Sequence, residues 1–164
     1  MACRGVHFAI LPGIMERLIE ATSDRDVLTI IQDEIEEEWD QDHLYQTDKA
    51  WDAIHRCLTD GKLAFDNGDF PLNAAILGGK QLYRGDDYVL SLVRPEQVPL
   101  LAAALAEFDK DKFSLGYSRI DQSDYQGKIG HEDLDYAWNW FNGLALFFAN
   151  AAAEGRAVIF TVDQ

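Results

Sequence analysis

The sequence predicts an α+β fold, in which a mainly helical single domain over residues 1–164 holds a small sheet of short strands. A chain of 164 residues with 48% hydrophobic content can bury one core. Short apolar runs near both ends predict that the N- and C-terminal segments are strands of this sheet. Between them, helical spacing of apolar residues dominates. Strands that are few and separated by helices are typical of the α+β class.

The expected strands are short. The run 5–11 carries apolar side chains on both faces, as a strand covered on both sides does. The runs 88–93 and 157–162 are rich in β-branched residues, and we expect them to complete the sheet.

Apolar spacing and capping residues predict helices at 14–22, 25–40 and 48–59 in the first half of the chain. Thr47 or Asp48 is the expected N-cap of the helix at 48–59, and Gly61 is its stop signal. The helix at 25–40 is expected to bury a stripe at helical spacing, formed by Leu28, Ile31, Ile35 and Trp39. Its opposite side then carries acids in water, namely Asp33, Glu36, Glu37 and Asp40.

Further along the chain, a short helix within 71–82 should end at Gly78 and Gly79, and a helix opened by Pro95 should run to 108. Residues 110–120 fit either a helix or a strand, and a loop follows them. From Glu132 one helix of some twenty positions is expected to form the hub of the core. Its apolar residues repeat at spacings of four and three, at Leu134, Trp138, Phe141, Ala145, Phe148 and Ala152.

The charge balance excludes several classes of ligand. Acidic residues outnumber basic ones by 29 to 14, which gives a formal charge of −15. Nucleic acids and anionic membrane surfaces are therefore repelled and are not expected partners. The start of the chain lacks the features of a signal peptide, and no apolar run is long enough to span a bilayer. Together with Cys3 and Cys57, which fit reduced thiols, this predicts a cytoplasmic protein.

No motif for catalysis or cofactor binding is present. There is no GxSxG sequence, and the GGK at Gly78 to Lys80 lacks the other parts of a phosphate-binding loop. Asp52 and His55 share a helix face, but only His43 stands near as another metal ligand, so no metal or cofactor is expected. Whether His7, His43, His55 and His131 converge stays open.

The densest feature is acidic, because residues 33–42 hold seven carboxylates in ten positions. Their mutual repulsion exceeds what solubility alone would demand, so we expect a docking face for a basic partner. The expected electrostatic contacts are Glu34, Glu36, Glu37, Glu38, Asp40 and Asp42, with Trp39 and Tyr45 as aromatic anchors. The alternative is a solvated face of a helix that keeps the protein soluble.

Four stretches in order resemble a known family: KAWDAIHRCLTDG from Lys49, PLNAAILGGKQL from Pro71, VRPEQVPLLAAALAEF from Val93, and the segment 132–160. They are similar to the YfbM-like family of small bacterial proteins, which carry a domain of unknown function. The resemblance implies one α+β domain in the bacterial cytoplasm and favours a helix at 110–120. It implies no established activity and no catalytic residue.

The leading hypothesis is a non-enzymatic, cytosolic binding protein whose acidic face occludes a basic partner, in its most concrete form an immunity-type protein against a basic toxin or nuclease. The rival is an enzyme or small-ligand-binding protein with a pocket around Trp51, His55, Gly78, Gly79 and Arg84. A module that self-associates through an apolar patch is a third reading, and the oligomeric state stays open.

Overall fold

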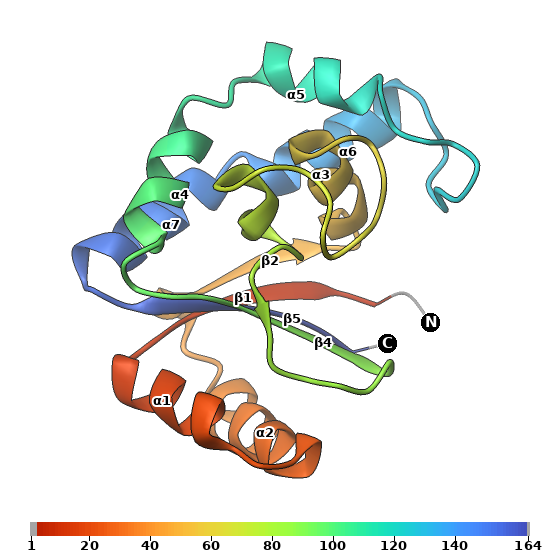
Figure 1. The fold of residues 1–164 in the computed structure, drawn as a ribbon. Helices are drawn as coiled ribbons and strands as arrows, with labels where there is room; N and C mark the ends of the chain where they lie inside the picture. Colours follow the sequence, from red (N-terminus) through yellow and green to blue (C-terminus); the bar gives the residue numbers. More distant parts are fainter. Residues whose placement is uncertain (1–2, 164) are drawn as a thin grey trace.

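In a computed structural model, which describes residues 3–163, a five-stranded antiparallel sheet divides the molecule into two helical layers (Figure 1). The strand order is β2-β1-β5-β4-β3. The strands are β1 (Gly5–Ile10), β2 (Leu44–Asp48), β3 (Lys80–Gln81), β4 (Tyr88–Val93) and β5 (Ala157–Asp163). The expected α+β class is confirmed, with both terminal strands in the sheet.

The smaller layer consists of α1 (Pro12–Glu20) and α2 (Asp24–Ile30), which lie below the sheet in Figure 1. The larger layer covers the opposite face. Its helices are α3 (Trp51–Leu58), α4 (Val98–Ala106), α5 (Lys110–Tyr117), α6 (His131–Phe141) and α7 (Leu144–Ala153).

Each central strand contributes side chains to both layers because successive residues point to opposite faces. On β1, Val6 and Phe8 pack with the α1–α2 core, whereas Ala9 packs with the α3–α7 core. All six residues of β1 and of β4 are buried, as expected for strands covered on both sides. Residues 110–120, which the sequence leaves open between helix and strand and for which the family resemblance favours a helix, contain α5. Residues 118–130 that follow α5 contain no regular helix or strand.

The prediction of one long helix from Glu132 is wrong in one respect. The helix is interrupted at Asn142 and Gly143, so that the segment forms two helices, α6 and α7. Apolar spacing continues across the break, so periodicity alone does not reveal it. The helix expected at 25–40 also differs: α2 continues into a π-helical segment, η1 (Ile31–Glu36), and helical structure ends at Glu38. In a π-helix each N–H bonds five residues back, which rotates the side chains. Ile30, Ile31 and Ile35 are buried, whereas Trp39, which lies beyond the end of the helix, is exposed.

Strand β2 was not predicted, and it also corrects the cap expected for α3. Thr47 is a buried residue of β2, and its hydroxyl donates to the carbonyl of Gly5 at 3.2 Å. Ala50 occupies the N-cap position of α3 without a side-chain cap. The short helix expected within 71–82 is reduced to a single 3₁₀ turn, η3 (Leu72–Ala75), followed by β3. Within residues 3–163, no helix is both long and apolar enough to cross a bilayer.

Candidate functional site

We call the helical segment 24–38, formed by α2, η1 and residues 37–38, the acidic helix. It ends in an unusual backbone conformation at Trp39. Its φ of 45° lies in the left-handed region, where glycine or asparagine commonly ends a helix. This turn carries the indole out of the helical stripe, so that 37% of Trp39 is exposed while its ring meets Phe8 edge-on. A short 3₁₀ turn, η2 (Gln41–His43), then leads the chain into β2.

Trp39 borders a shallow hollow between the end of the acidic helix and α6. The hollow has a volume of about 470 Å³, and Tyr45 and Trp140 line it together with Trp39. The other residues that line it are mostly polar, and they are Gln41, Leu44, Gln46 and Asn139. We call this the aromatic hollow. The anchors expected from the sequence, Trp39 and Tyr45, thus lie in one place, and Trp140 joins them from a distant part of the chain.

Tyr45 also explains why the helical pattern breaks between α6 and α7. Its hydroxyl donates to the carbonyl of Trp140 and accepts the N–H of Gly143 at 3.1 Å. These bonds satisfy backbone groups that a helix end leaves without partners. A Cβ at Gly143 would approach the Tyr45 ring to 2.8 Å, so the close contact requires glycine. Burial raises the pKa of the Tyr45 phenol, which keeps the hydroxyl proton in place.

Part of the expected acidic docking face is occupied by internal contacts. Glu34 forms a two-pronged ion pair with Arg17 at 2.6 and 2.7 Å, and these hydrogen bonds lower the pKa of Glu34. Glu36 was expected on the wet side of its helix, but it is half-buried and accepts a hydrogen bond from Tyr88 at 2.7 Å. Burial raises the pKa of Glu36. These two acids therefore bind the acidic helix to α1 and β4.

Asp40 and His43 form a second internal network. The His43 ring lies 2.6 Å from Asp40 and 2.8 Å from Glu154, and Arg156 pairs with the same Glu154 at 2.9 Å. The hydrogen bond from His43 lowers the pKa of Asp40, and the same bond raises the pKa of His43. This network ties the end of the acidic helix to the end of α7.

Of the six acids expected to make electrostatic contacts, those without such internal contacts are Glu37, Glu38 and Asp42. All three are exposed, and their side chains form no ion pair or hydrogen bond within residues 3–163. They flank Trp39 and Gln41 in the sequence, and these two residues line the aromatic hollow. Of the expected electrostatic contacts, these three are free to meet a partner.

The residues of the alternative pocket do not gather around one cavity. Trp51 lines a groove at the start of α3, whereas His55 is 1% exposed and its Nε2 lies 2.8 Å from Asn67. Gly78 and Gly79 pack against the backbone of Asn73 and Leu92. Arg84 borders a separate hollow beside α1 and α2.

The histidines likewise make separate contacts. His7 is buried among Phe147, Phe148 and Phe160, and His131 is exposed at the start of α6. Within residues 3–163, no group of three or more His, Cys, Asp and Glu side chains is arranged to hold a metal ion.

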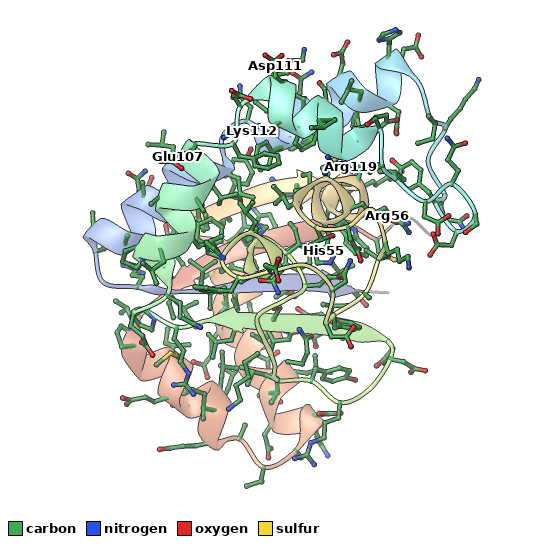
Figure 2. The ribbon with its side chains drawn as sticks, turned by 45° about the horizontal axis from the view of Figure 1, so that its top comes forward. His55, Arg56, Glu107, Asp111, Lys112 and Arg119 are labelled. Carbon is green, nitrogen blue, oxygen red and sulfur yellow. The ribbon has the colours of Figure 1, made fainter. Side chains whose placement is uncertain are left out.

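Arg56 is a buried charge that the sequence analysis did not single out. In Figure 2 it extends from α3 toward the loop that precedes α6. The other charged residues labelled there lie at the end of α4 or along α5 and just after it, namely Glu107, Asp111, Lys112 and Arg119. The Nε of Arg56 bonds Asp52, and another guanidinium nitrogen bonds Asp124 at 2.7 Å. The spacing of Asp52 and Arg56, four apart on one helix, was the available signal for the first of these pairs.

A model of the family described as "Domain of unknown function (DUF1877)" matches residues 1–161. The chain belongs to the DUF1877 family. The resemblance seen in the sequence is thereby confirmed.

A solved structure shares the fold of this DUF1877 member. It is described as a protein of unknown function, YfbM from Escherichia coli, and it has a TM-score of 0.73 and 20% sequence identity. The match covers 97% of this chain and 99% of that one. No curated protein matches the chain.

Proposed function

We propose that this protein is a non-enzymatic binding protein that receives a basic protein partner at the aromatic hollow. The single observation that carries the proposal is the position of Trp39, Tyr45 and Trp140 around one hollow. The free acids Glu37, Glu38 and Asp42 flank its lining residues in the sequence. Exposed aromatic side chains supply apolar contact area, and a surrounding rim of charge selects the partner.

The backbone of Trp39 supports this reading. A left-handed conformation costs a bulky residue on the order of 1 kcal/mol, and such strain is concentrated at functional positions. At Trp39 it turns a large indole partly into solvent instead of burying it in the helical stripe.

The charge of the whole chain supports a basic partner. With 29 acidic and 14 basic residues, the protein attracts cationic macromolecules over several ångströms and accelerates their association. A basic toxin or nuclease in the cytoplasm would be such a partner, and occlusion of its active surface would make this an immunity-type protein.

The experiment compares two triple variants that carry the same net charge. The hollow variant, Glu37→Lys/Glu38→Lys/Asp42→Lys, reverses the free acids that flank Trp39 and Gln41 in the sequence. The control variant, Asp66→Lys/Asp86→Lys/Glu96→Lys, reverses exposed acids elsewhere. Immobilised wild-type protein and both variants are exposed to lysate of the native cell, and bound proteins are quantified by mass spectrometry.

We expect a basic protein that is bound by the wild type and the control variant but not by the hollow variant. Its association with the hollow variant should be slower by about tenfold and should depend less steeply on salt. Trp39→Ala should weaken the same complex through faster dissociation, because it removes an anchor but no charge. Equal binding by both triple variants, or no basic protein that distinguishes them, would refute the proposal.

A further inference from the structure

A second groove lies at the start of α3, at the opposite end of α6 from the aromatic hollow. It has a volume of about 610 Å³, within the ~300–1,000 Å³ range of small-molecule sites. Its walls come from α3, from the loop before α6 and from α6 itself, where Trp51, Tyr125 and Tyr136 supply aromatic rings. Asp52 and Asp133 supply carboxylates on the same walls.

The polar hydrogens of the three aromatic side chains are already donated to the protein. The Trp51 indole N–H donates to the carbonyl of Cys3 at 3.1 Å. The Tyr125 hydroxyl donates to Asp133 Oδ2 at 2.8 Å, and the Tyr136 hydroxyl donates to Asp48 at 2.6 Å. The rings are therefore fixed in place, and their polar tips have no hydrogen left for a ligand.

The carboxylates keep acceptor capacity. Asp52 uses Oδ1 for Arg56, and Asp133 uses Oδ2 for Tyr117 and Tyr125. Among residues 3–163, no hydrogen-bond partner is found for Asp52 Oδ2 or Asp133 Oδ1. An ionised carboxylate only accepts hydrogen bonds, so the ligand that fits must donate them.

The local charges favour a cation. Arg56 is buried and is balanced by Asp52 and Asp124, which together carry one charge more than it does. Asp133 has no cation paired with it among the described residues. Lys49 is the opposing charge on the wall, but it is exposed, so water and salt screen its repulsion.

We propose that this groove binds an alkylammonium group, with its N–H donors toward Asp52 and Asp133 and its carbon chain along Trp51, Tyr125 and Tyr136. Aromatic faces attract ammonium ions and also cover the adjacent methylene groups. The same head group occurs in free amines and in lysine side chains. The size of the groove and its enclosure by three chain segments favour a free small amine.

The experiment titrates the protein with cadaverine and follows the indole N–H signal of Trp51 by ¹H–¹⁵N NMR, assigned with Trp51→Phe. 1,5-Pentanediol has the same chain length and no charge, and it serves as the ligand control. Nα-acetyl-lysine methylamide represents a protein-borne lysine. We expect a saturable shift with cadaverine, none with the diol at equal concentration, and weaker binding of the lysine derivative.

Matched variants separate this groove from the general attraction of a protein with a charge of −15. Asp133→Asn should weaken cadaverine binding about tenfold, whereas Asp135→Asn removes an exposed charge from the same helix and should change it less than twofold. Lys49→Gln should strengthen binding about twofold to threefold, and it tests the site even if Asp133→Asn does not fold.

The proposal is overturned if cadaverine shows no saturation, if the diol binds equally, or if Asp133→Asn and Asp135→Asn weaken binding alike. Tighter binding of the lysine derivative than of cadaverine would reject a free amine as the ligand. The groove shares no lining residue with the aromatic hollow, so cadaverine binding and partner binding succeed or fail separately.

Discussion

His7 is a polar residue buried in the core between the sheet and the larger helical layer. It is 0% exposed, lies among phenylalanine rings, and its Nε2 is 2.7 Å from the carbonyl of Ala75. Burial lowers its pKa to about 4, from an ordinary value of 6.5, because a charged imidazole would lose its hydration there. The neutral ring donates to Ala75 and fastens the chain before β3 to the sheet.

This residue makes stability depend on pH. The pKa of His7 is lower in the folded than in the unfolded chain, so its contribution is complete above pH 6.5 and is lost as pH falls toward 4. The loss amounts to about 3 kcal/mol across this window. We expect the free energy of unfolding, measured with urea from pH 7.5 to 4.5, to fall less in His7→Gln than in the wild type.

Carboxylates titrate in the same window, so the difference between proteins is the relevant quantity. His131→Gln changes an exposed histidine at the start of α6 and serves as the control. It should keep the slope of the wild type. If His7→Gln also keeps that slope, His7 is not the buried neutral group described above.

At the scale of elements, junctions are decided by contacts between segments far apart in the sequence. The break between α6 and α7 is held by Tyr45 from β2, and the loop before α6 is held by Arg56 from α3. The acidic helix is similarly held by Arg17 of α1 and Tyr88 of β4. Each of these contacts satisfies a charge or a backbone group that would otherwise lack a partner.

Glycine substitutions test the α6–α7 junction. Gly143→Ala should lower the free energy of unfolding by about 1–3 kcal/mol, because the added methyl group meets the Tyr45 ring. Gly13→Ala, in α1, meets nothing within 4 Å and should raise the free energy of unfolding by roughly 0.5 kcal/mol. Chemical denaturation of the two variants gives the comparison. Equal effects would mean that the junction tolerates a side chain and that Tyr45 does not require glycine there.

At the scale of the whole molecule, one sheet supports two cores while the surface carries a large excess of negative charge. The formal charge of −15 favours association with cations and opposes compactness through self-repulsion. Internal ion pairs such as Arg17–Glu34 relieve only part of this repulsion.

Salt should therefore stabilise the protein. Raising NaCl from 10 to 300 mM shortens the Debye length from about 30 Å to less than 10 Å, which screens repulsion among the acids. We expect the free energy of unfolding at pH 7.5 to rise by on the order of 1 kcal/mol. Urea denaturation at both salt concentrations measures it, with the acid-reversed triple variants showing a smaller rise. A fall in stability would mean that attractive ion pairs outweigh the net repulsion.

The sequence by itself determined the class of fold, the terminal strands and the family, because these depend on local periodicity and on residue order. Periodicity left residues 110–120 open between helix and strand, and only the family resemblance favoured the helix. The sequence also located the run of acids and the nearby aromatic residues Trp39 and Tyr45. The tertiary structure alone decided that Glu34, Glu36 and Asp40 are bound internally, and that Trp140 completes the aromatic hollow. The reason is physical: burial and pairing depend on which distant segments meet, and a residue's spacing along its own helix does not contain that information.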